Sequence, residues 1–191
     1  MKIWICFWTY APLHQGHLDV IMRAKKENDK CFVFVCWSDR DGWYGCWLSI
    51  CKRYRLVKKF FEDDESIIVV CLNETSLWLD GSWSDKNLNI WLSSIYNQIQ
   101  YNEISWEVTR YVSKNKYKEV LDKNIKKMWV VAWVVNNPTI LLDSSQNLIS
   151  SVQCRENPLR YRNKIAYTFR GNFSHNILIL MNYEWMKNNF S

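Results

Sequence analysis

Two histidines near the start of the chain, His14 and His17, are the residues best suited to chemistry. They lie three positions apart, directly after an apolar run and at the expected start of a helix, so both imidazoles should face one side. Imidazoles donate hydrogen bonds to phosphoryl oxygens, and a helix start adds free backbone N–H groups. Gly16, between them, would let a phosphate approach the backbone. The pattern favours a polyphosphate site; loop histidines that only make the turn and cap the helix are the alternative.

A second polar cluster, far along the chain, combines two hydroxyls with a guanidinium. Ser150 and Ser151 stand at the expected start of a late helix, and Arg155 follows about one turn later. Arginine forms a planar fork that suits phosphate oxygens, whereas serine is also a favoured N-cap. Helix caps and a surface salt bridge of Arg155 are therefore the structural alternatives. The polyphosphate hypothesis requires this cluster to lie on the same side of the sheet as the histidine pair.

Alternating apolar and amphipathic segments must position these residues. The run Ile3–Thr9 has the continuous apolar character of a central parallel strand, and an amphipathic helix over 16–28 leads to a second strand over 31–37. Further strands are expected over 66–71, 105–112, 128–135, 139–142 and 176–180. Helices are expected over 50–61, 83–101, 116–123 and most of 151–173, with an interruption near Pro158. The sequence therefore predicts an α/β fold: a Rossmann-like, doubly wound parallel sheet flanked by helices.

Composition limits the class of protein. The 191 residues, 48% of them hydrophobic, suit one globular domain, and no apolar run reaches the roughly 18 residues needed to cross a bilayer. The net charge of +6 favours anionic partners without choosing among them. The basic residues of the helix over 50–61 are interpreted as its solvated face: Lys52, Arg53, Arg55, Lys58 and Lys59. We expect neither a nucleic acid nor a membrane as partner, and a homo-oligomer stays open.

The cysteines indicate a reducing compartment. Seven is an odd number, and most of them lie in apolar segments, so an extracellular disulfide framework is not expected and the cytoplasm fits better. Cys31 and Cys36 are further apart than the Cys-x-x-Cys pairs of structural zinc sites. No protein-bound metal is expected.

With these motifs in place, the sequence resembles the HxGH nucleotidyltransferases, and most closely the nicotinamide-mononucleotide adenylyltransferase domain of bifunctional adenylyltransferase and ribosylnicotinamide kinase proteins. The similarity covers almost the whole chain and rests on three regions: 11–20, 52–65 and 149–158. It implies a nucleotidyltransferase domain over 1–175 and, over 176–191, a strand and tail that are a remnant of the start of a kinase domain. A kinase activity is not expected, because Met181–Asn188 keeps the lysine of a phosphate loop but lacks its glycines and its Ser or Thr.

The resemblance implies that the chain joins ATP, bound with Mg²⁺, to nicotinamide mononucleotide and releases pyrophosphate. The catalytic residues would be His14, His17 and Arg155. The residues that bind ATP would be Thr9, Tyr10, Gly16, Ser150 and Ser151. Trp83 and Trp91 resemble the tryptophans of the family around nicotinamide, since an aromatic face suits a flat cation. For Trp91, a place in the core of its helix is an equal alternative.

The sequence departs from the family at tryptophans that stand where related sequences have glycine: Trp4, Trp8 and Trp37. At position 8 the family uses glycine just ahead of the histidines, so the indole could fill the phosphate site. The chain contains 12 Trp and only 5 Gly. A codon that means glycine in the source but was read as tryptophan would explain this, and drift away from catalysis is the competing account. Two alternative functions follow: cytidylyl or adenylyl transfer to another phosphorylated acceptor, and a non-catalytic module that senses a nucleotide.

Overall fold

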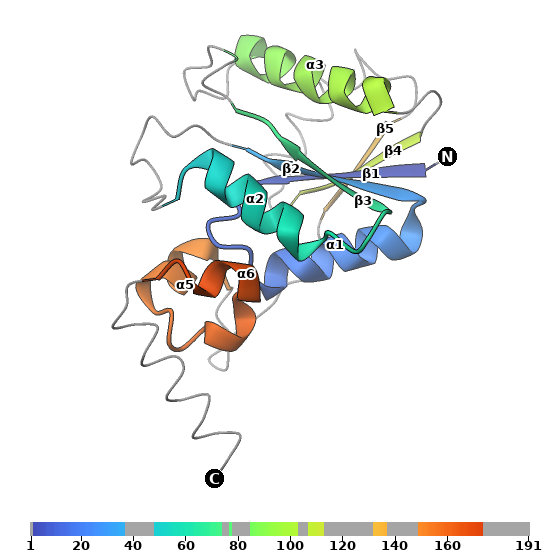
Figure 1. Cartoon of the computed structure of the whole chain (residues 1–191). Coiled ribbons are helices and arrows are strands. Elements are labelled where there is room, and N and C mark those ends of the chain that lie inside the picture. Colours follow the sequence, from blue (N-terminus) through green and yellow to red (C-terminus); the bar gives the residue numbers. More distant parts are fainter. Residues whose placement is uncertain are drawn as a thin grey trace.

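The computed structural model describes residues 2–36, 48–73, 77, 85–102, 107–112, 132–136 and 149–173. Five strands form one sheet in the order β3-β2-β1-β4-β5, and every neighbouring pair is parallel. The first strand of the chain is therefore central, and the strand order reverses direction beside it (Figure 1). This confirms the predicted Rossmann-like parallel sheet, whose ligands bind at the carboxyl ends of the strands near such a reversal.

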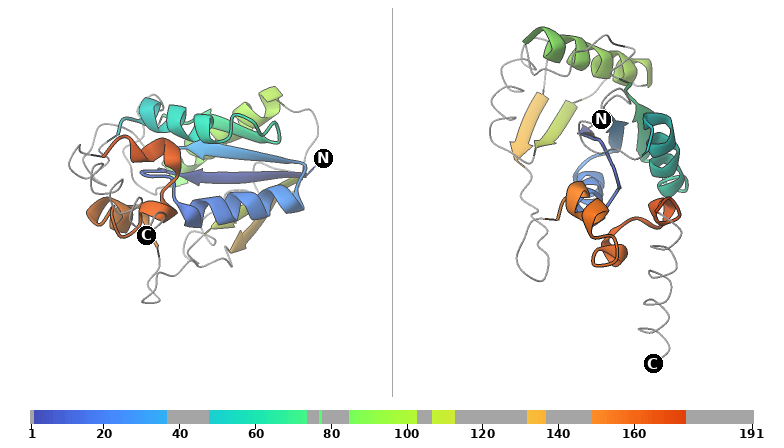
Figure 2. Two further views of the ribbon diagram at one scale, coloured as in Figure 1. Left: turned by 60° about the horizontal axis from the view of Figure 1, so that its bottom comes forward. Right: turned by 90° about the vertical axis from the view of Figure 1, so that its left-hand side faces the viewer.

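The strands are β1 (Lys2–Trp8), β2 (Lys30–Val35), β3 (Ile67–Cys71), β4 (Glu107–Val112) and β5 (Ala132–Asn136). The helices are α1 (Gln15–Glu27), α2 (Ile50–Phe60), α3 (Asp85–Asn102), α5 (Ser151–Glu156), the 3-10 helix η3 (Arg162–Lys164) and α6 (Tyr167–Arg170). In the views of Figures 1 and 2, α3 covers one face of the sheet, while α1 and α2 cover the other.

The sheet separates two hydrophobic clusters, because side chains alternate between its faces. Trp4 and Cys6 of β1 belong to the cluster under α1 and α2. Ile3 and Ile5, their neighbours in sequence, belong to the cluster under α3. This double burial explains why β1 is apolar at every position after Lys2, as parallel strands covered on both faces are.

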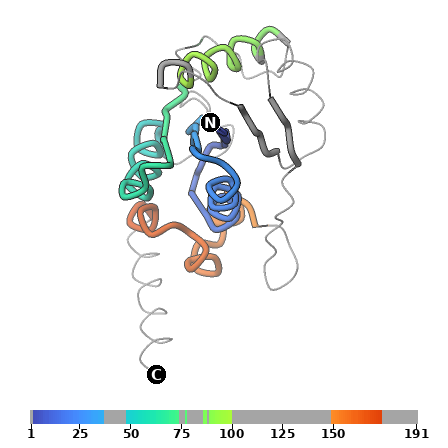
Figure 3. The backbone as a smooth tube through the Cα atoms, turned by 90° about the vertical axis from the view of Figure 1, so that its right-hand side faces the viewer, coloured from blue at the N-terminus to red at the C-terminus, as the bar shows by residue number. Residues whose placement is uncertain are grey.

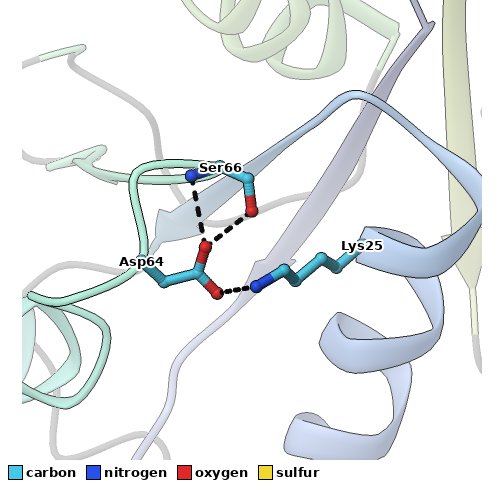
Figure 4. Close-up of polar contacts among 3 residues, drawn as sticks. All are labelled: Lys25, Asp64 and Ser66. Carbon is cyan, nitrogen blue, oxygen red and sulfur yellow. Dashed lines mark hydrogen bonds and ion pairs between the residues drawn. The ribbon is translucent and has the colours of Figure 1, made fainter.

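Polar contacts hold the far end of α1. Lys25, in its last turn, forms an ion pair of 2.5 Å with Asp64 in the connection between α2 and β3 (Figure 4). The same carboxylate accepts hydrogen bonds from the backbone N–H and the hydroxyl of Ser66. Partial burial alone would raise the pKa of Asp64, but the bonds from Lys25 and Ser66 outweigh it and hold the pKa below its ordinary value. The contact ties α1 to the start of β3.

The predicted elements that fall on described residues are present, with ends shifted by a few residues. The late segment is the exception: instead of a mostly helical stretch, 151–173 contains three short helices separated by turns. α5 ends at Glu156 because Pro158 follows, and the chain then turns back on itself. The helix expected over 116–123 and the strands expected over 139–142 and 176–180 lie outside the described residues.

In the part of the chain that the structure describes, no helix combines the length and the apolar character required to cross a membrane.

Candidate active site

The two histidines occupy the junction that the sequence predicts for them, between β1 and α1. β1 ends at Trp8, a short loop follows, and α1 begins at Gln15. The junction lies at the carboxyl end of the central strand, beside the reversal of strand order. It is the place where parallel α/β sheets bind phosphorylated ligands.

Both imidazoles cap α1, and each does so with Nδ1. His14 is the N-cap and accepts a bond of 3.1 Å from the N–H of Gly16, while His17 accepts one of 3.4 Å from the N–H of His14. The two rings stack with centroids 3.9 Å apart. A nitrogen that accepts a hydrogen bond carries no proton, so in each neutral ring the proton is on Nε2. Both histidines therefore cap the helix, as the alternative expects, and each ring keeps an Nε2–H donor, so a ligand role stays a prediction.

Burial keeps both rings uncharged at neutral pH. His14 is 4% exposed and His17 is 9% exposed. Desolvation lowers the pKa of His14 from 6.5 to about 4. Desolvation, followed by the nearby His14, also holds the pKa of His17 well below its ordinary value. The pair can thus offer hydrogen bonds, but not positive charge, to an anion at pH 7.

The shape of the cap explains why position 16 is a glycine. A Cβ atom at this position would lie 3.1 Å from Cε1 and 3.2 Å from Nδ1 of His14. That is tighter than ordinary van der Waals contact, so a side chain here would press on the imidazole. The glycine therefore protects the cap, and its predicted role in admitting phosphate stays a prediction.

Trp8 and Tyr10 surround the ring of His17. The centroid of the Trp8 indole lies 5.3 Å from that of His17, and the Tyr10 ring stands edge-on at 4.9 Å. Tyr10 is fully buried, and its backbone has a φ of 47°, in the left-handed region that residues other than glycine rarely adopt. Its ring can therefore act on a ligand only through His17. The indole, half-buried, occupies the position beside the motif where the resemblance expects glycine.

The hydroxyl and guanidinium cluster meets the same loop. Ser151 Oγ donates to the carbonyl of Pro12 at 3.2 Å, and the guanidinium of Arg155 donates to the carbonyl of Ala11. Ser150 is the N-cap of α5 and forms a reciprocal capping box with Gln153. Figures 2 and 3 show the segment 149–173 beside the junction of β1 and α1. The structure thus brings both motifs together, as the hypothesis required.

Backbone contacts from the C-terminal segment also hold the loop between β1 and α1. Ala166 N–H donates to the carbonyl of Leu13 at 3.0 Å, and Ile165 forms an isolated antiparallel bridge with His14. The loop between β1 and α1 is therefore held from the C-terminal segment over its length, not only at Arg155. The two motifs form one local structure although the contacts between them join residues 139 and 144 positions apart in sequence.

The predicted acceptor tryptophans have separate outcomes. Trp83 lies outside the described residues. Trp91 is 6% exposed in the cluster under α3, where it stands edge-on to Phe7 with ring centroids 4.6 Å apart. It is a core residue, as the alternative had it, on the face of the sheet opposite α1. Its buried Nε1–H has no hydrogen-bond partner among the described residues.

Arg53 corrects the interpretation of the basic helix. Lys52, Arg55, Lys58 and Lys59 are exposed, but the Arg53 side chain is fully buried and donates to three backbone carbonyls. One signal could have found it: Ile50, Arg53 and Val57, at spacings of three and four, make up the buried face of α2. The prediction that Arg53 faces solvent was wrong, because its place on the apolar face of α2 decides its burial.

No group of three or more His, Cys, Asp or Glu side chains in the described ranges is arranged to hold a metal ion.

Comparisons with known proteins agree with this geometry. A solved structure described as NadR in complex with NAD and AMP-PNP is 30% identical, with a TM-score of 0.72 over 91% of this chain and 47% of that one. Another, of NadR with NR, is 29% identical, with a TM-score of 0.73 over 91% of this chain and 45% of that one. The chain thus spans less than half the length of either.

Among curated proteins, the phosphopantetheine adenylyltransferase of Fusobacterium nucleatum subsp. nucleatum is 35% identical over 69 residues, which are 36% of this chain and 40% of that protein. The family model described as cytidylyltransferase-like matches residues 6–157, which include both motifs. The chain therefore belongs to the cytidylyltransferase-like family, among the HxGH nucleotidyltransferases.

Proposed function

We propose that this chain transfers the adenylyl group of ATP to the phosphate of a mononucleotide, with nicotinamide mononucleotide as the first acceptor to test. The observation that carries the proposal is the meeting of the two motifs. Ser151 and Arg155 contact the carbonyls of Pro12 and Ala11, directly before the two capping histidines. Four polar side chains from distant parts of the sequence thus gather around one loop: His14, His17, Ser151 and Arg155.

In the proposed reaction, an oxygen of the acceptor phosphate attacks the α-phosphorus of ATP. A new P–O bond forms, the bond from the α-phosphorus to the bridging oxygen breaks, and pyrophosphate leaves with the electron pair. The Nε2–H groups of His14 and His17 donate to phosphate oxygens, and Arg155 stabilises the negative charge that builds up on the pyrophosphate. Ser151, whose one proton goes to the carbonyl of Pro12, positions the loop that carries the histidines. The protein acts by aligning two anions, and no covalent intermediate is needed.

Mg²⁺ enters the proposal as part of the substrate. ATP is bound in cells as its magnesium complex, and the ion bridges phosphate oxygens and neutralises charge. The uncharged state of His14 and His17 fits a substrate whose charge is already partly balanced.

The identity of the acceptor is the part of the proposal that the fewest observations support. The NadR relatives, solved with NAD or NR, favour nicotinamide mononucleotide, whereas the curated relative acts on phosphopantetheine. Trp91, the one described member of the predicted acceptor pair, is a core residue and favours neither acceptor. Transfer of a cytidylyl or adenylyl group to another phosphorylated acceptor is therefore the second enzymatic candidate.

A pyrophosphate-release assay tests these proposals directly. The purified chain is incubated with ATP or CTP and with nicotinamide mononucleotide, nicotinate mononucleotide or phosphopantetheine in turn. Release with ATP and nicotinamide mononucleotide, together with formation of NAD, supports the first proposal. Release with a different pair transfers support to that acceptor. No release with any pair contradicts transferase activity.

One observation favours a non-catalytic alternative. The Trp8 indole packs against His17, and both imidazoles are largely buried, so a nucleotide has to displace the indole or share space with it. A chain that binds ATP in calorimetry but releases no pyrophosphate would be a nucleotide sensor. The variant Trp8→Gly should then bind ATP more tightly and gain turnover. Mass spectrometry of the natural protein at position 8 tests whether tryptophan is the native residue.

A further inference from the structure

Arg53 is buried at the point where the chain leaves the sheet for the histidine loop. Its side chain is 0% exposed. Nε donates to the carbonyl of Leu48 at 3.1 Å, and Nη1 donates to the carbonyls of Cys36 at 2.8 Å and Thr9 at 2.5 Å. A guanidinium removed from water is costly unless its donors are satisfied, so these bonds are essential to its place.

The three carbonyls have a common location. The last backbone bond between β1 and β2 runs from Cys36 N–H to the carbonyl of Trp8, at 3.0 Å. Beyond this bond, the next carbonyls after β1 and β2 are those of Thr9 and Cys36. A single nitrogen of Arg53 donates to both. Leu48 precedes Ser49, the N-cap of α2. Arg53 therefore joins the ends of two strands to the start of a helix.

A short path leads from this junction to the histidines. Thr9 precedes Tyr10, whose left-handed backbone needs support from its surroundings because it is strained at a residue other than glycine. The Tyr10 ring then stands edge-on to His17, 4.9 Å between centroids. A change at the Thr9 carbonyl would thus reach the imidazole through one covalent neighbour and one ring contact.

We propose that Arg53 is a positioning residue of the nucleotide site, which holds the Thr9 carbonyl and thereby the Tyr10 ring that supports His17. Its effect on turnover rests on the proposed function, whereas its effect on the His17 ring does not. Lysine cannot replace it, because one ammonium on a flexible stem cannot reach the Leu48, Cys36 and Thr9 carbonyls with the geometry of a planar fork.

NMR of the histidine rings tests the positional part without any substrate, and the chain has only three histidines to assign. In Arg53→Lys, we expect the His17 ring to titrate at higher pH than in the unmodified chain, because a displaced Tyr10 ring admits water. Val57→Ala, a buried change on the same face of α2, is the matched control and should leave that titration unchanged. An unchanged His17 titration in a folded Arg53→Lys protein overturns the proposal.

A second pair of variants keeps the proposal testable if Arg53→Lys does not fold. Tyr10→Leu removes the supporting ring and should shift the His17 titration in the same direction. Tyr10→Phe keeps the ring and loses only a hydroxyl that has no hydrogen-bond partner among the described residues, so it should not. Equal titrations of His17 in both variants overturn the proposed path.

Turnover separates positioning from simple stabilisation. Arg53→Lys should lower kcat/KM about tenfold, through kcat rather than through the KM for ATP, because a misplaced donor acts mainly in the transition state. Val57→Ala should retain kcat at a temperature where both variants are folded. Normal kcat in Arg53→Lys makes the residue purely structural. Absence of turnover in the unmodified chain instead contradicts the proposed function, and the NMR result still decides the role of Arg53.

Discussion

The two motif helices, α1 and α5, begin in the same way but use different atoms. Each starts with a reciprocal capping box: His14 with His17 in α1, and Ser150 with Gln153 in α5. The serine and glutamine oxygens are used by the caps themselves. An imidazole has two nitrogens, and capping with Nδ1 leaves Nε2 free to act. The comparison teaches that a side chain with two separate polar atoms can cap a helix with one atom and keep the other available.

The largest expected effect is on stability in acid, because only the α1 cap titrates between pH 4 and 7. Burial lowers the folded-state pKa of His14 from 6.5 to about 4, so the unfolded chain binds its proton first as the pH falls. The stabilisation is complete above about pH 6.5 and is lost as the pH falls towards 4, on the order of 3 kcal/mol. Urea unfolding between pH 7.5 and 4 measures it. A flat profile across this range contradicts the buried, neutral state of the cap.

A smaller effect should distinguish the capping role of Nδ1 of His17 from the proposed donor role of its Nε2. In His17→Asn, the amide oxygen can replace Nδ1 as acceptor for the His14 N–H, but nothing replaces Nε2–H. We expect turnover to fall by about 10² while the melting temperature changes little, since a lost donor to developing charge has about this effect. Pyrophosphate release and thermal melting measure the two. His175→Asn, the third histidine, is the control and should keep full turnover.

The α5 cap should show the opposite behaviour to that of α1. Ser150→Ala removes the acceptor for Gln153 N–H and should lower the free energy of unfolding by about 1 kcal/mol. Because a hydroxyl does not titrate, the loss should be equal at pH 7.5 and pH 5. Urea unfolding at the two pH values checks this. A loss that depends on pH would show that the α5 cap is coupled to the histidines.

The smallest effect is expected at the other end of α1, where an ion pair acts beside the C-cap Asn28. Asp64→Asn removes the partner of Lys25, a pair whose side chains are 42% and 21% exposed, so solvent screens it. The free energy of unfolding should fall by about 0.5 kcal/mol, and added salt should reduce the difference. Asp63→Asn, an exposed neighbour, is the control. A loss above about 2 kcal/mol would mean that the pair is far more important than its exposure indicates.

The sequence predicted the first half of the fold well, because β1, α1, β2 and α2 have strong and different periodicities. It also predicted that His14, His17, Ser151 and Arg155 would lie close together, since strand-to-helix junctions of a parallel sheet meet at one edge, and all four lie at the β1–α1 loop. The segment 151–173 was less predictable, because contacts with the β1–α1 loop shape its turns. The burial of Arg53 depends on carbonyls that are distant in sequence, and the use of Nδ1 for capping depends on the orientation of the imidazole rings. The local sequence pattern contains information on neither.

The sheet divides the protein interior into two halves. His17 and Tyr10 pack together on the α1 and α2 side, whereas Trp91 packs with α3. Substitutions that reshape the α3 half should therefore leave the packing of the histidine loop undisturbed. Such separation allows one half of the interior to diverge in evolution while the other half keeps its side chains.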